Sequence, residues 1–158
     1  MINADTNAQG IRERMKNSTE LPMTEEPLYA LTAKMLDCVS RHDFETLSGI
    51  CDDTYGIIDI NTDGSSKIMR NRYEWEQWFK GLFVKLKEMQ AKTWSEITRY
   101  EVEVFADSAY SVVDFDQILI VGEKRMRFAV IATIIWKKVD SGWKEARYHS
   151  SLLSVKEE

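Results

Sequence analysis

The spacing of hydrophobic positions along this chain changes most clearly near Gln90. Before that point apolar residues recur every three or four positions, as in amphipathic helices. This spacing predicts a helix over residues 25–43, a short second helix capped by Asp43, and a third helix that begins after Asn71. Residues 54–61 are rich in β-branched side chains and are predicted to form a strand, followed by a turn and a short return strand. The third helix has the strongest apolar stripe: Trp75, Trp78, Phe79, Leu82, Phe83, Leu86 and Met89.

After Gln90 the period becomes two, which predicts β-strands. Four strand-like segments follow, joined by the short turns ADS, GEK and DSG. Helices first and a meander afterwards predict an α+β fold, with three helices packed on one face of a strongly bent antiparallel sheet. A single domain over residues 25–158 accounts for this pattern. Residues 1–24 are polar and lack periodicity, so we expect a flexible arm or a short docked helix there.

Two of the turns predict how the last three strands pair. We expect a two-residue turn at GEK and a three-residue loop at DSG, and the second of these pairs Val139 with Trp143. Counting back from the loop places Thr133 opposite His149. One sheet face then mixes polar and apolar residues: Tyr110, Val112, Asp114, Asp116, Ile131, Thr133, Ile135, Arg147, His149 and Ser151. The other face is apolar: Phe128, Val130, Ala132, Ile134, Trp136, Ala146, Tyr148 and Leu152.

The strand FAVIATIIW, residues 128–136, is apolar on both faces. A sheet that is covered by helices on one side leaves its other face wet, where polar residues are expected. Apolar residues on both faces therefore imply a second cover, and the simplest one is another copy of the same sheet. We predict a homodimer whose interface is formed by Phe128, Ile134, Trp136 and Tyr148. The mixed face then lies under the helices and lines an interior pocket.

The stretch ATIIWKKVDSGWKEARYHSS, residues 132–151, resembles the ending of SnoaL-like and ketosteroid-isomerase-like members of the nuclear transport factor 2-like superfamily. It also resembles the association domain of calcium/calmodulin-dependent protein kinase II. The matching residues are Thr133, Trp143, His149 and Ser151. Many relatives carry a second His where this chain has Arg147. The resemblance, which in element order covers residues 25–155, implies a cystatin-like cone with an interior pocket, usually as a homodimer, and no single reaction.

The mixed face carries the candidate site. His149 is a candidate general base or acid because its unperturbed pKa lies near 6.5, and a half-buried His bonded to its neighbours is the alternative. Asp114 interrupts an apolar strand, where burial would raise its pKa, unless Arg127 or Arg147 pairs with it. Arg147 is also suited to hold an anionic group on the ligand. The remaining candidate ligand contacts are Thr133, Tyr110, Tyr100 and Ser151.

Composition narrows the choice of function. The chain of 158 residues has 26 acidic and 21 basic side chains, and this net charge of −5 disfavours nonspecific binding to nucleic acid. The longest apolar run is far shorter than the roughly 20 residues of a membrane span. Cys38 and Cys51 lack metal-site spacing and are predicted to be buried free thiols. We therefore expect no metal, no cofactor and a cytoplasmic location. Asp59 and Asp63 are interpreted as turn residues of the first hairpin.

These features predict a pocket for a small, partly apolar organic ligand. If the protein is an enzyme, we expect cofactor-independent acid/base chemistry beside a carbonyl group, namely isomerisation, cyclisation or dehydration. His149 or Asp114 would be the base. The alternative is a non-catalytic module for self-association or ligand binding, in which side chains of the third helix plug the pocket.

Overall fold

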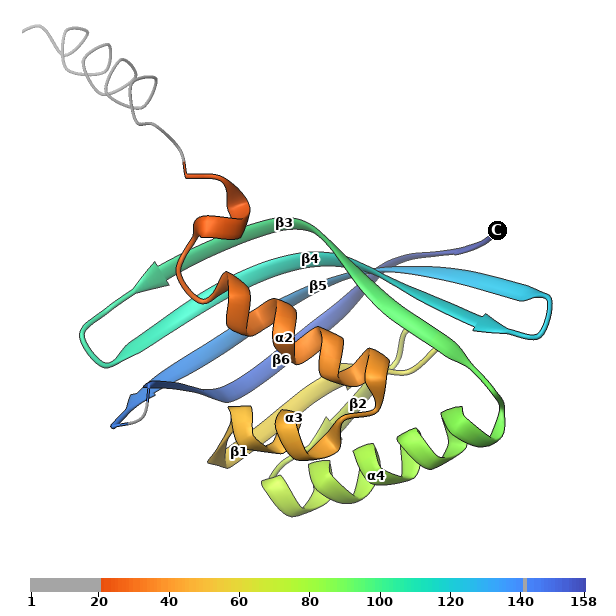
Figure 1. The fold of residues 1–158 in the computed structure, drawn as a ribbon, viewed down its shortest axis with the longest axis horizontal. Coiled ribbons are helices and arrows are strands. Elements are labelled where there is room, and N and C mark those ends of the chain that lie inside the picture. Colours follow the sequence, from red (N-terminus) through yellow and green to blue (C-terminus); the bar gives the residue numbers. More distant parts are fainter. Residues whose placement is uncertain (1–20, 141) are drawn as a thin grey trace, which may run out of the picture.

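The structure, a computed structural model, describes residues 21–140 and 142–158. The predicted arm over residues 1–24 falls mostly outside these residues and stays a prediction. The elements are η1 (Met23–Glu25), α2 (Tyr29–Arg41), α3 (Phe44–Ile50), β1 (Cys51–Ile60), β2 (Ser66–Met69), α4 (Arg72–Glu88), β3 (Lys92–Val104), β4 (Ser108–Val121), β5 (Lys124–Val139) and β6 (Gly142–Glu157) (Figure 1).

Side-chain caps begin two of the helices where the sequence predicts them. The backbone N–H of Thr46 donates to the Asp43 carboxylate at 3.1 Å, which starts α3. The N–H of Glu74 donates to the Asn71 side chain at 3.0 Å, which starts α4. The first helix begins later than predicted, at Tyr29, because the residue before it has a left-handed backbone that an α-helix cannot contain.

The six strands form one sheet in the order β2-β1-β6-β5-β4-β3. The meander from β3 to β6 is antiparallel, as predicted. The strand β1, however, runs parallel to β6, so the sheet is mixed rather than purely antiparallel. The physical reason lies in the connections: tight turns force neighbouring strands to run antiparallel, whereas the chain passes through β2, α4 and three further strands between β1 and β6, so no tight turn joins these two.

The predicted pairing of the last three strands is confirmed over most of their length. Thr133 lies opposite His149, as counted from the turns. At the final hairpin, however, Val139 pairs with Gly142 rather than with Trp143. A bulge, in which Ala146 has no partner across the pair, shifts the register back by one residue before Arg147. The two deviations cancel, so the faces of β6 beyond the bulge are those that the sequence predicts.

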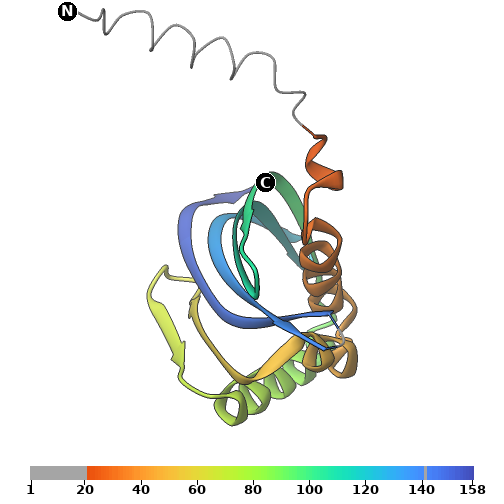
Figure 2. The same cartoon turned by 90° about the vertical axis from the view of Figure 1, so that its left-hand side faces the viewer.

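Which face the helices cover is the opposite of what we predict from the sequence. The sheet curls strongly, and the helices close its concave side (Figure 2). Ile134 and Trp136 on this side have no exposed surface, and Phe128 and Tyr148 also point into the interior. The predicted dimer interface through these four residues is therefore wrong. Burying each large apolar side chain under the helices stabilises the fold by about 1.5–3 kcal/mol, whereas burying the mixed face would remove several polar groups from water.

Aromatic residues of α4 form much of the core on the concave side of the sheet. The ring of Phe79 lies 5.4 Å from that of Trp75 and 5.5 Å from that of Phe83, between ring centroids. Cys38 and Cys51 are buried and free, as predicted. Within residues 21–140 and 142–158, no helix has both the length and the hydropathy needed to cross a membrane.

Candidate functional site

A cavity of about 660 Å³ lies between the concave face of the sheet and the helices α2 and α4. This volume is within the usual range of small-molecule sites. The aromatic side chains of α4 form part of its wall and leave the interior open. The wall is mainly apolar, and large contributors to it are Met35, Trp78, Phe79, Phe115, Phe128 and Val130.

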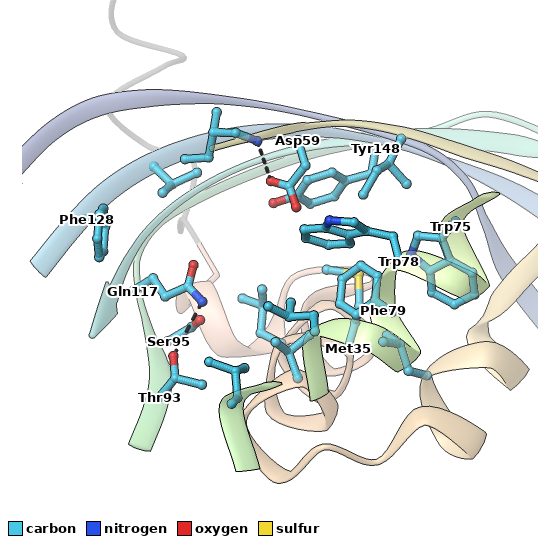
Figure 3. Close-up of a pocket in the computed structure, with 18 of the residues that line it drawn as sticks. Met35, Asp59, Trp75, Trp78, Phe79, Thr93, Ser95, Gln117, Phe128 and Tyr148 are labelled. Atoms are coloured by element: carbon cyan, nitrogen blue, oxygen red, sulfur yellow. Dashed lines mark hydrogen bonds between the residues drawn. The ribbon is translucent and has the colours of Figure 1, made fainter. Parts of the chain in front are cut away.

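Asp59 places a carboxyl group in this apolar wall (Figure 3). It follows Tyr55 and Ile57 on the same side of β1, because alternate residues of a strand share a face. Its Oδ1 accepts a hydrogen bond from the Ile60 N–H at 2.8 Å and one from the Ser150 hydroxyl at 2.9 Å. Burial raises the pKa of Asp59, although both hydrogen bonds act in the opposite direction.

Tyr148 lies beside Asp59 in the cavity (Figure 3). The parallel pairing of β1 with β6 sets this position, because Ile57 is the partner of Tyr148. Burial, and then the negative charge of Asp59, raise the pKa of Tyr148 well above its usual value. The phenol therefore keeps its proton at neutral pH and is a hydrogen-bond donor next to a carboxyl group.

A second carboxyl group lies behind the cavity wall. Glu145 has no exposed surface, and its Oε1 accepts a hydrogen bond from the Tyr55 hydroxyl at 2.8 Å. Its Oε2 has no hydrogen-bond partner within the described residues. Burial raises the pKa of Glu145 to about 8, so this side chain is mostly neutral at pH 7. The ring of Tyr55 lines the cavity, so the hydrogen bond between Tyr55 and Glu145 joins the cavity wall to the buried core.

Most of the residues predicted to form the site lie on the convex outer face of the sheet. The exposed ones are Tyr110, Thr133, Arg147, His149 and Ser151, and Asp114 is half-buried on the same face. None of them lines the cavity, so their predicted position inside the pocket is wrong. The physical reason is the face assignment: the register that we predict is correct, but the helices cover the apolar side.

Two of these candidates make structural contacts instead. The guanidinium of Arg147 donates to the carbonyl of Thr54 and so ties β6 to an irregular stretch of β1. Gly56 belongs to the same stretch. A larger residue would be too crowded at this position, because a Cβ there would lie 2.8 Å from the Arg70 carbonyl oxygen. Tyr100 is buried, but its hydroxyl donates to the Pro27 carbonyl at 2.8 Å, which fastens β3 to the segment before α2.

Asp59 is the residue that our sequence reasoning misses. Its interpretation as a turn residue is wrong, since it belongs to β1, whereas Asp63 does lie in the turn and accepts hydrogen bonds from Ser65. A usable signal was present in TYGIIDIN, because Asp59 shares the phase of Tyr55 and Ile57. An acid on the apolar side of a strand is costly to bury, and it is therefore a candidate for function.

The chemistry available in the cavity is that of carboxyl, phenol, hydroxyl and amide groups. The described residues gather no cluster of three or more His, Cys, Asp or Glu side chains that could hold a metal ion. A carboxyl group with a raised pKa beside a protonated phenol can remove a proton from carbon and hold the oxygen on which negative charge develops.

Fold and cavity together define a cystatin-like α+β protein of the nuclear transport factor 2-like superfamily, as the resemblance implies. Within that superfamily the chain belongs to the SnoaL-like domain family, which it matches over residues 28–155. No curated protein matches the chain.

Solved structures share the fold at low sequence identity. A protein of Streptomyces avermitilis, provisionally named a dehydratase of the nuclear transport factor 2-like family, is 18% identical, covers 84% of this chain and 97% of its own, and has a TM-score of 0.69. A provisional scytalone dehydratase of Novosphingobium aromaticivorans is 11% identical, covers 98% and 91%, and has a TM-score of 0.65. The calcium/calmodulin-dependent protein kinase II hub homology domain of Chlamydomonas reinhardtii is 15% identical, covers 80% and 96%, and has a TM-score of 0.65.

Proposed function

We propose that this protein binds a small carbonyl compound in the interior cavity and moves a proton at the carbon next to the carbonyl group. Isomerisation, cyclisation and dehydration of a carbonyl compound can each begin with such a step. The observation that carries the proposal is the carboxyl group of Asp59, which stands in an aromatic cavity with one oxygen held by two donors. A carboxylate in such surroundings is a stronger base than one in water, because burial raises its pKa.

The proposed step follows from the groups at this end of the cavity. The ionised Asp59 takes the proton from the α-carbon, and the electron pair of the C–H bond moves into a carbon–carbon double bond. The carbonyl oxygen becomes an enolate oxygen, to which Tyr148 donates a hydrogen bond. In an isomerisation, the protonated Asp59 returns the proton to another carbon as the carbonyl re-forms. In a dehydration, it gives the proton to a β-hydroxyl group, which leaves as water while the enolate electrons form the carbon–carbon double bond and the carbonyl re-forms. Ser150 and the Ile60 N–H keep the carboxylate in one orientation throughout.

The relatives with this fold support the same class of chemistry. Two of the solved structures named above are provisionally called dehydratases. Their low identity establishes the fold alone, so the argument for a reaction here rests on the residues of this chain.

Exchange of carbon-bound protons tests the proposal directly. With 2-tetralone as the probe, in D₂O, we expect the protein to accelerate deuterium incorporation beside the carbonyl at least about 100-fold over acetate at equal concentration, as measured by proton NMR. His149→Ala is the matched control on the outer face, and it should leave the rate unchanged. Loss of exchange in His149→Ala together with full activity in Asp59→Asn would place the base outside the cavity and sink the proposal.

We propose self-association as a second function, through the convex face rather than through the predicted apolar one. No element within residues 21–140 and 142–158 packs on the middle of this face (Figure 2). Ile135 is 47% exposed there, and Tyr110 is 39% exposed on the adjoining strand. Among the similar structures is a hub homology domain, a type of module whose name denotes assembly. A second copy is the occupant that suits this face, because two such sheets can bury their apolar residues against each other.

Light scattering tests this self-association. Ile135→Asp places a charge in the middle of the proposed interface, so we expect wild-type protein to run as a dimer or larger and the variant to shift to the monomer mass. Val84→Asp is the control, because Val84 is a similarly exposed apolar residue on the helix α4. A monomeric wild type, or equal assembly of both variants and the wild type, contradicts an interface on the convex face.

We place these functions in a reducing compartment, with the cytoplasm as the proposed location. Cys38 and Cys51 are both free and buried. Disulfides are rare in cytosolic proteins, where thiols are kept reduced, and two unpaired cysteines suit that setting.

A further inference from the structure

The cavity has polar groups at a second place, far from Asp59. Thr93 and Ser95 follow each other on the inner side of β3, and Gln117 projects from β4 directly opposite Ser95 in the pairing of the two strands. The Gln117 side-chain amide donates to the Thr93 hydroxyl at 3.4 Å. Figure 3 shows the three side chains together on one side of the cavity, with Asp59 and Tyr148 on the other.

The topology explains this separation. The strands β1 and β3 are four steps apart in the sheet order, which is about 19 Å along the sheet at roughly 4.8 Å per step. The sheet curls strongly (Figure 2), and because of this curl residues of β1, β3 and β4 line one cavity. The rest of the wall is mainly apolar, and Phe128 on β5 is the strand partner of Gln117.

These two ends differ in charge. Asp59 supplies a carboxyl group at one end, whereas Thr93, Ser95 and Gln117 supply two hydroxyl groups and one carboxamide, none of which ionises. Lys85 on α4 also lines the cavity and is exposed to solvent. The one hydrogen bond that the structure gives Gln117 uses a single amide N–H, and within the described residues its carbonyl oxygen and second N–H are left for a ligand. A carboxamide can donate to and accept from the same hydroxyl-bearing ligand, but it provides no charge to neutralise an anion.

We propose that Thr93, Ser95 and Gln117 form a subsite for an uncharged hydrogen-bonding group at the far end of the ligand. The ligand class that suits these groups is a flat ring ketone whose carbonyl lies near Tyr148 and whose opposite end carries an uncharged hydroxyl group. This differs from the anionic ligand that Arg147 suggests in the sequence, since Arg147 lies outside the cavity. The inference rests on the proposed function for the orientation of the ligand, because the carbonyl end is assigned by the chemistry of Asp59.

A matched pair of probes tests the subsite by binding rather than by turnover. Calorimetry should show that 6-hydroxy-2-tetralone binds the wild type about three- to tenfold more tightly than 2-tetralone, the usual effect of one net hydrogen bond. Gln117→Leu should bring this ratio close to one while leaving the affinity for 2-tetralone within about threefold. Gln77→Leu is the control, since Gln77 lines the same cavity from α4 and the substitution is the same. The ratio of this control should match that of the wild type.

Several results overturn the subsite. These are a wild-type ratio near one, an unchanged ratio in Gln117→Leu, an equal fall in Gln77→Leu, and no binding of either ketone to folded protein. Thr93→Val is a second variant with a smaller change in shape, and it should lower the ratio as well. Asp59→Asn separates this inference from the proposed function, because the variant should keep the wild-type ratio while it loses proton exchange. If the wild type exchanges protons but binds both ketones equally tightly, the subsite is refuted while the proposed function stands.

Discussion

Glu145→Gln is expected to remove most of the pH dependence of folding stability between about pH 5 and 8, and to stabilise the protein above pH 8. The pKa of Glu145 rises from 4.5 to about 8 on burial. Because the folded state holds this proton more tightly than the unfolded state, stability is highest below the unfolded pKa and falls as the pH rises toward 8. Gln keeps an oxygen to accept the Tyr55 hydroxyl but carries no charge at any pH.

The groups around Glu145 leave this effect undisturbed. Tyr55 and Cys51 on β1 and Tyr148 on β6 are its neutral neighbours, and burial raises the pKa of each, so none of them ionises below pH 8. Lys144 lies next to Glu145 in the chain but donates to the Gly49 carbonyl. Since the Oε2 of Glu145 has no partner among the described residues, nothing there compensates its charge once the proton leaves.

Urea unfolding at several pH values measures this effect. The slope for one such group is about 1.4 kcal/mol per pH unit, so the wild type should lose about 3–5 kcal/mol between pH 5 and pH 8. The Glu145→Gln curve should be nearly flat over this range apart from the contribution of Asp59, whose raised pKa acts with the same sign. Glu123→Gln, in the exposed turn after β4, is the control and should follow the wild type. If the stability curves of the wild type and Glu145→Gln run parallel between pH 5 and 8, Glu145 is ionised in the folded state over this range and the prediction is wrong.

Asp59→Asn is expected to lower the rate of deuterium exchange into 2-tetralone by at least about 100-fold, with little change in the affinity for the ketone. The amide has nearly the shape of the carboxylate and can still accept from Ser150, but it cannot take a proton. In the wild type, exchange should rise with pH and level off above the raised pKa of Asp59, because only the ionised form is the base. The protein should stay at least as stable as the wild type, since the substitution removes a costly buried charge.

Asp63→Asn is a close control for this substitution. Asp63 is four residues further on, in the exposed turn after β1, where Ser65 donates to it from both its N–H and its hydroxyl. The same chemical change at this position should leave exchange unaltered. If Asp59→Asn retains exchange at the wild-type rate, or if loss of exchange accompanies loss of ketone binding, Asp59 is not the base.

The parts of the fold that depend on neighbouring residues could be predicted from the sequence. The apolar stripe after Asn71 and the caps at Asp43 and Asn71 follow from spacing and capping chemistry, and the two-residue turn at GEK follows from turn chemistry. The predicted pairing of Thr133 with His149 is correct only because the bulge at Ala146 offsets the different turn at the last hairpin. The family could be recognised for the same reason, because the order of the elements and one local motif identify it.

The candidate site could not be predicted in this way. His149 and Asp59 are both polar residues in strands with apolar neighbours, and alternation alone does not tell which side of a strand faces the helices. The choice between the two faces of the sheet then depends on which side chains are chemically suited to a site, and this criterion favours the face that contains His149. The surroundings of Asp59 could not be predicted because Ser150, which donates to its carboxylate, is 91 residues away in the chain and becomes a neighbour only through the parallel pairing of β1 with β6.

The chain alone therefore determined most of the helices and strands and the turn between β4 and β5, since these arise from contacts between residues close in sequence or joined by short turns. Only the tertiary structure decided which face became the interior, that β1 runs parallel to β6, and that Asp59, Tyr148 and Gln117 share one cavity. The physical reason is that burial is a property of the whole fold. The helices cover the face whose burial removes the most apolar surface from water, and the polar groups on that face line the candidate site.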